Sequence, residues 1–125
     1  MSRQAGEDKA LIWLGSSLDD LREFPKAVQR SIGRGLRLAQ GGEKAHEAKP
    51  LKGYGGAGVL ELVASHMGNA YRAVYTVTFP EVVYVLHAFE KKSKRGRMTP
   101  QADIATVDRR LQVAEQDYAG RKHDA

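Results

Sequence analysis

Three β-rich runs separated by very short connections constrain the fold of this chain more than any other feature. The runs are VLELVAS (59–65), AYRAVYTVTF (70–79) and VVYVLHAF (82–89), which are rich in Val, Tyr and Thr. The connecting sequences, HMGN and PE, are typical of tight turns. Because a parallel pair of strands needs a crossover of roughly a dozen residues or more, the three runs are predicted to form an antiparallel meander.

A strand and two helices are predicted ahead of the meander. The short apolar run KALIWLG (9–15) predicts a first strand. Ser17 then predicts the N-cap of a short helix that ends near Phe24. Pro25 suits the first turn of a second helix, which is expected to end at the glycines after Gln40.

Two glycines inside the second predicted helix require an explanation. Val28, Ile32 and Ala39 have helical spacing, and another face carries a basic ridge of Lys26, Arg30, Arg34 and Arg37. Gly33 and Gly35 each cost about 1 kcal/mol relative to Ala in a helix interior. Either close packing against a neighbouring element or a break in the helix must account for them.

The remaining segments complete an α+β prediction. Residues 41–58 hold six of the thirteen glycines, which predicts a long mobile connection. Thr99 and Pro100 predict the start of a final helix that ends near Tyr118, with Ile104, Val107, Leu111 and Ala114 on its apolar face. The expected fold is α+β, with the helices against one face of the sheet. Residues 1–125 are expected to form a single domain with flexible ends at about 1–8 and 119–125.

Charge and the absence of cysteine limit the possible functions. Twenty Lys and Arg against fifteen Asp and Glu give a formal charge of +5, which favours an anionic partner without choosing among nucleic acid, an acidic protein and a membrane surface. The chain has no cysteine, so disulfides, thiolate metal sites and Cys nucleophiles are excluded. The four histidines are widely separated, so we expect no metal and no other cofactor. The apolar patch near the start is too brief for a signal peptide or a membrane span, which predicts a cytoplasmic protein with no membrane partner.

An arginine within the second β-rich run is a candidate binding residue. Strict alternation places Arg72 on a face with Val74 and Thr76, opposite the face of Tyr71 and Tyr75. Because helices are expected on only one side of the sheet, Arg72 could lie on an open face and bind a phosphate as a bidentate fork. An ion pair with Glu61 on the preceding strand is about equally compatible with the spacing.

The last strand leads from a histidine into a run of cations. Alternation predicts that His87 and Phe89 share a face with Val83 and Val85. A histidine can exchange a proton near neutral pH, but a lone histidine on an apolar face is more often a core residue, and the residues alone favour that interpretation. The run from Lys91 to Arg97 is either a solvated loop or a nucleic-acid site, in which Phe89 could stack on a base.

Three ordered segments carry a family resemblance: KPLKGYGGAGVLELV, YRAVYTV and VYVLHAFEKKSKRGRMTP. Together they resemble the phage-derived, HigB-like branch of the RelE/ParE toxin superfamily, over about residues 11–114. The resemblance implies an N-terminal helical hairpin packed on a small twisted antiparallel sheet with a C-terminal helix. It also implies the toxin of a type II toxin–antitoxin system, whose partners would be mRNA on the ribosome and a helix-turn-helix antitoxin encoded next to it.

The resemblance further implies an endoribonuclease that uses no metal and inhibits translation. In such enzymes the 2′-hydroxyl of RNA attacks the adjacent phosphate, which requires an acid, a base and nearby cations. The implied catalytic residues are Arg72, His87, Lys91 and Lys92, where His87 or a lysine of lowered pKa would transfer the proton. The implied RNA-binding residues are Lys49, Lys52, Phe89, Lys94, Arg95 and Arg97.

This sequence departs from its relatives in one place, and two other functions are alternatives to an mRNA endoribonuclease. Many relatives have an arginine where this chain has Leu62 and Val63, so one phosphate contact could be missing. A ParE-like member of the superfamily would instead poison DNA gyrase. A non-catalytic basic module would bind only nucleic acid or its antitoxin.

Overall fold

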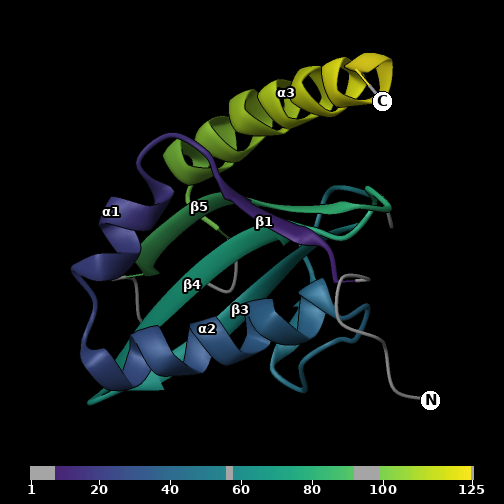
Figure 1. Cartoon of the computed structure of the whole chain (residues 1–125). Coiled ribbons are helices and arrows are strands. Elements are labelled where there is room, and N and C mark those ends of the chain that lie inside the picture. Colours follow the sequence, from purple (N-terminus) through teal and green to yellow (C-terminus); the bar gives the residue numbers. More distant parts are fainter. Residues whose placement is uncertain (1–7, 56–57, 92–98, 125) are drawn as a thin grey trace.

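The computed structural model describes residues 8–55, 58–91 and 99–124 of the 125-residue chain. Its elements, in chain order, are β1 (Ala10–Trp13), α1 (Ser17–Arg22), α2 (Lys26–Gln40), β2 (Ala48–Pro50), β3 (Val59–His66), β4 (Asn69–Thr76), β5 (Val82–Lys91) and α3 (Gln101–Asp124). The fold is α+β, as predicted. A five-stranded sheet lies between α2 on one side and α3 on the other (Figure 1).

The three long strands form the predicted antiparallel meander. β3 pairs with β4 from Val59 opposite Thr76 to His66 opposite Asn69, and β4 pairs with β5. Met67 and Gly68 connect β3 to β4, and both have positive φ angles, of 51° and 85°. Positive φ at both central residues is what a type I′ hairpin turn requires, and this turn matches the twist of the flanking strands.

Two further strands change the predicted antiparallel sheet into a mixed one, with the order β1-β5-β4-β3-β2. β1 pairs in parallel with β5, from Ala10 opposite Val82 to Trp13 opposite Val85. Parallel pairing is possible because most of the chain connects the two strands. β2 pairs antiparallel with β3 inside the segment that was predicted to be a mobile connection, and that part of the prediction is wrong.

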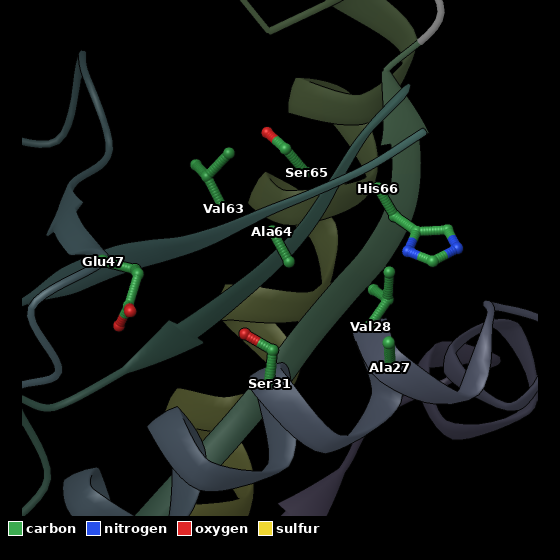
Figure 2. Close-up of a pocket in the computed structure, with 8 residues that line it drawn as sticks. All are labelled: Ala27, Val28, Ser31, Glu47, Val63, Ala64, Ser65 and His66. Atoms are coloured by element: carbon green, nitrogen blue, oxygen red, sulfur yellow. The ribbon is translucent and has the colours of Figure 1, made fainter. Parts of the chain in front are cut away.

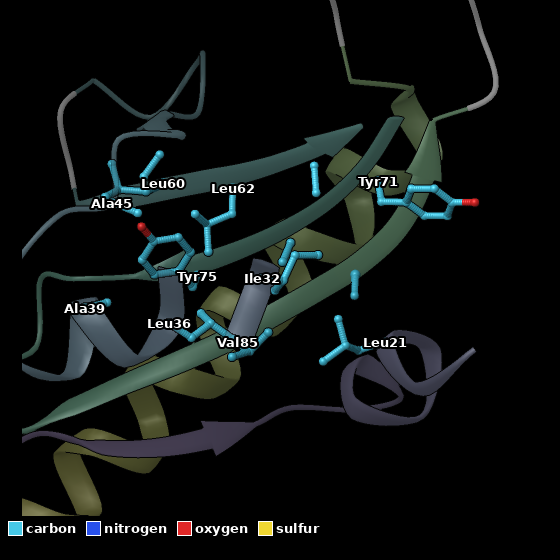
Figure 3. Packing of buried hydrophobic residues seen from close by; sticks show 14 of the residues in the cluster. Leu21, Ile32, Leu36, Ala39, Ala45, Leu60, Leu62, Tyr71, Tyr75 and Val85 are labelled. Atoms are coloured by element: carbon cyan, nitrogen blue, oxygen red, sulfur yellow. The ribbon is translucent and has the colours of Figure 1, made fainter. Parts of the chain in front are cut away.

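α2 is one continuous helix that covers one face of the sheet. Its buried residues pack with strand residues into a core cluster whose members include Ile32, Leu36 and Tyr75 (Figure 3). A Cβ atom added to Gly35 would lie 2.5 Å from Cδ2 of Leu62, so close packing explains this glycine. Nothing lies within 4 Å of the corresponding position at Gly33, and the structure offers no reason for that glycine.

α3 covers the opposite face, which corrects the expectation that all helices pack on one side. Its apolar residues, Ile104, Val107, Leu111, Ala114 and Tyr118, pack in a second core cluster with residues of β3, β4 and β5. β5 is apolar at successive positions and not only at alternate ones, so both faces of the sheet need cover. The helix also continues to Asp124, beyond its expected end near Tyr118.

A β-bulge in β5 changes the direction of its last side chains. Val74 lies opposite His87, but its neighbour Tyr75 lies opposite Val85, so Leu86 is an extra residue on β5. Residues before the bulge follow the predicted alternation. His87 and Phe89, however, lie on the α3 face, and the prediction that they share a face with Val83 and Val85 is wrong.

Candidate functional site

Four charged residues from four adjacent strands gather on the α3 face of the sheet. We call Lys49 (β2), Arg72 (β4) and Lys91 (β5), together with Glu61 (β3), the cationic cluster. Lys49 lies opposite Glu61 on paired strands, and Arg72 lies opposite Phe89. Three cations around a single carboxylate leave this part of the sheet with excess positive charge.

The ion pair that was considered for Arg72 is present. Its Nη1 donates to both carboxylate oxygens of Glu61, each at 2.8 Å, and both side chains are buried. Lys49 reaches the same carboxylate at 3.6 Å from a largely exposed position. Nε of Arg72 is buried and has no hydrogen-bond partner among the described residues. The guanidinium is therefore oriented by Glu61 but keeps an unused donor.

Lys91 is the last residue of β5 and is only 6% exposed. Its ammonium nitrogen makes no hydrogen bond to any described residue. Burial lowers the pKa of Lys91, and the positive charges of Arg72 and Lys49 lower it further, against the opposing effect of Glu61. A buried, unpaired ammonium is rare in proteins and favours either an anionic ligand or loss of its proton.

His87 is held beside this cluster by a residue that sequence reasoning missed. Its Nε2 lies 2.7 Å from Oδ1 of Asp103, in the first turn of α3. Its ring stacks on that of Phe89, with centroids 4.9 Å apart and an interplanar angle of 20°. The other ring nitrogen, Nδ1, is buried and has no partner within the described residues. An acid in the first turn of a helix is common for helix-dipole reasons alone, so Asp103 carried no specific signal.

The bulge places His87 and Phe89 on the same face of the sheet as the cationic cluster. Phe89 touches His87 and lies directly opposite Arg72. His87 lies opposite Val74, so Arg72 is its diagonal neighbour, and such neighbours are roughly 7–8 Å apart in a sheet. Of the predicted site residues, the structure thus brings together Lys49, Arg72, His87, Phe89 and Lys91.

The other predicted site residues lie elsewhere or are not described. Lys52 is exposed in the turn that follows β2. Lys92, Lys94, Arg95 and Arg97 lie outside the described residues. Phe89 is 9% exposed and stacks on His87, so its ring is engaged within the protein.

A cavity of about 240 Å³ lies away from this site, between α2 and the end of β3 (Figure 2). Its lining comprises Ala27, Val28, Ser31, Glu47, Val63, Ala64, Ser65 and His66. It includes no residue of the cationic cluster. The chemistry of the candidate site therefore depends on the α3 face of the sheet and not on this cavity.

The described residues contain neither a candidate metal site nor a candidate membrane-spanning helix. Residues 8–55, 58–91 and 99–124 contain no group of three or more His, Cys, Asp or Glu side chains that could hold a metal ion. Among the helices of these same segments, none is both long and apolar enough to cross a membrane.

Comparison with known proteins assigns the chain to a family. A search of curated proteins found no match. A family model described as "Phage derived protein Gp49-like (DUF891)" matches residues 19–112. The match begins within α1 and ends within α3, so it includes the cationic cluster, His87 and Asp103. The chain therefore belongs to the Gp49-like family of phage-derived proteins.

Proposed function

We propose that this protein is the toxin of a type II toxin–antitoxin pair and that it cleaves mRNA. The HigB-like resemblance of the meander and basic run suggests this function, and membership of a phage-derived family is compatible with it. The observation that carries the proposal is a pair of buried donors on the face that bears His87, Nε of Arg72 and Nζ of Lys91, neither of which has a partner in the described part of the chain. Cationic donors of this kind suit the oxygens of a phosphate group.

The proposed reaction needs only the side chains of this face. Nδ1 of His87 would accept the proton of a ribose 2′-hydroxyl, and the 2′-oxygen would attack the adjacent phosphorus. As the bond from phosphorus to the 5′-oxygen breaks, the ammonium of Lys91 would donate a proton to that oxygen. The products are a cyclic 2′,3′-phosphate and a free 5′-hydroxyl, and the protons balance between His87 and Lys91.

The electrostatic part of catalysis falls to Arg72. Its guanidinium, fixed by Glu61, would stabilise the additional negative charge of the pentavalent phosphate. The lowered pKa of Lys91 brings its proton donation closer to neutral pH, which improves it as a general acid. Lys49 and Lys52 would contact RNA farther along the strand, and their exposed positions leave them accessible.

A toxin of this kind needs an inhibitor in the same cell. We propose an antitoxin with a helix-turn-helix domain, encoded next to this protein. Its binding would suppress the activity until the antitoxin is degraded.

The test compares two lysine variants during induction in bacteria and with purified protein. Lys91→Met removes the buried ammonium, whereas Lys26→Met removes an exposed lysine from α2, which covers the opposite face of the sheet. We expect wild type and Lys26→Met to arrest growth and to cut mRNA, with cyclic phosphate ends. Lys91→Met should cut at least roughly 100-fold more slowly.

Three outcomes would overturn the proposal. Intact transcripts with gyrase trapped on broken DNA would instead favour a gyrase poison. Binding to RNA without growth arrest or cleavage, with or without ribosomes, would favour a non-catalytic module. Undiminished cleavage by folded Lys91→Met would remove Lys91 from the mechanism.

A further inference from the structure

We propose that Asp103 is a positioning residue that selects the tautomer of His87 and so leaves Nδ1 as the proton acceptor of the site. The catalytic consequence rests on the proposed function, whereas the tautomer itself does not. Nothing in the family match assigns a role to Asp103.

The tautomer follows from the one contact that the imidazole makes with a carboxylate. Nε2 of His87 lies 2.7 Å from Oδ1 of Asp103. An ionised carboxylate can only accept hydrogen bonds, so Nε2 must carry the hydrogen. A neutral imidazole has one N–H, and Nδ1 therefore keeps its lone pair.

The helix fixes the position of Asp103 beside the imidazole. Asp103 lies in the first turn of α3. Its own backbone N–H donates to the carbonyl of Pro100 at 3.0 Å, and its side chain is 24% exposed. The charged groups that face this region from the packed elements include Asp103, Arg110, which donates to the carbonyl of Leu86, and the diagonal Arg72. Asp103 is the anion among them, so its carboxylate is the hydrogen-bond acceptor for Nε2.

The remaining contacts of the ring fix its plane. Phe89 stacks on one face of the imidazole, and the bulge at Leu86 turns His87 toward α3. Nδ1 is buried and has no partner among the described residues. The His87 side chain lies on the same face of the sheet as the cationic cluster. A lone pair held in this way can accept the proton of a hydroxyl whose phosphate is bound by Arg72 and Lys91.

The alternative is that the contact between His87 and Asp103 has a purely structural role. In that case the His87–Asp103 pair would only fasten the start of α3 to the sheet, much as the bond from Tyr54 to Asp108 fastens α3 to the segment between β2 and β3. Asp108→Asn is therefore the matched control, because it makes the same chemical change in the same helix outside the candidate site.

The first measurement is the tautomer of His87, read from its ring ¹⁵N chemical shifts in two-bond ¹H–¹⁵N NMR spectra of the full chain. We expect the Nε2–H form in wild type and in Asp108→Asn. Asp103→Asn should give a mixture, because an amide can accept from Nε2 or donate to it. An Nδ1–H form in wild type, or an unchanged spectrum in Asp103→Asn, would overturn the inference even if the protein cleaves no RNA.

The second measurement is cleavage of RNA at saturating and limiting substrate. Asp103→Asn should lower kcat by roughly 100-fold, with KM within about twofold of wild type, and Asp108→Asn should change neither. A changed tautomer with undiminished kcat would refute the role of Asp103 while leaving the proposed function intact. Absence of cleavage by wild type would refute the proposed function, and the NMR result would still decide whether Asp103 selects the tautomer.

Discussion

Replacing Lys91 by Met should stabilise the folded protein while it removes a group that the proposed function requires. Lys91 is 6% exposed, and its ammonium has no hydrogen-bond partner among the described residues. Leaving a buried polar group unpaired costs about 1–3 kcal/mol, and Met retains much of the apolar stem that fills the same space. We therefore expect the free energy of unfolding of Lys91→Met to exceed that of wild type by about 1–3 kcal/mol.

The size of this gain should depend on pH in a defined direction. Burial and the charge of Arg72 lower the pKa of Lys91 below its ordinary value of 10.5. Below the lowered pKa, the folded protein holds a charged lysine and the whole penalty applies. Between the lowered pKa and 10.5, the unfolded chain binds a proton that the folded chain has lost, so wild-type stability rises with pH. The advantage of Lys91→Met should therefore shrink across this window.

Urea unfolding, followed by far-ultraviolet circular dichroism at neutral and alkaline pH, measures both effects. The control is Lys26→Met, which changes an exposed lysine and should stay within about 0.5 kcal/mol of wild type. If Lys91→Met were no more stable than wild type at neutral pH, the ammonium would not be an unpaired buried charge. A constant difference at every pH would show that its titration is not coupled to folding.

Two further predictions concern the glycines of α2 and the carboxylate of the cationic cluster. Gly35→Ala should lower the free energy of unfolding by about 1–3 kcal/mol, because its Cβ would lie 2.5 Å from Leu62. Gly33→Ala should instead raise the free energy of unfolding by roughly 0.5–1 kcal/mol. Equal effects of the two substitutions in thermal unfolding would contradict the packing explanation. Glu61→Gln should lower the free energy of unfolding by about 3–5 kcal/mol, because the buried guanidinium of Arg72 loses its counter-charge. A urea unfolding midpoint equal to that of wild type would argue against a stabilising role for this ion pair.

Local patterns predicted the parts of the fold that depend on neighbouring residues. The meander follows from turns of a few residues, and α3 follows from the spacing of Ile104, Val107, Leu111 and Ala114. The strand that pairs with β1 lies far away along the chain, with Ala10 opposite Val82, and period-two patterns carry no information about such a pairing. β2 has only three residues and ends in Pro50, so it resembles the loop around it.

The candidate site could also be predicted only in part from local sequence patterns. The ion pair of Arg72 with Glu61 is a contact between adjacent strands of a hairpin, and it could be weighed from spacing alone. The contact of His87 with Asp103 depends on the extra residue at Leu86 and on the sheet face against which α3 packs. Neither feature can be read from the local sequence pattern.

The bulge at Leu86 connects the fold to the proposed chemistry. With strict alternation, His87 would follow Val83 and Val85 onto the α2 face, where Tyr75 and Ile32 fill the core and Asp103 is out of reach. The extra residue instead turns His87 and Phe89 toward the face that carries Arg72 and Lys91. A bulge of this kind costs ladder hydrogen bonds, and a buried ammonium with no partner among the described residues costs stability, so neither is explained by folding alone. Both occur within one small region of the sheet, and binding and cleavage of a phosphodiester there would account for both.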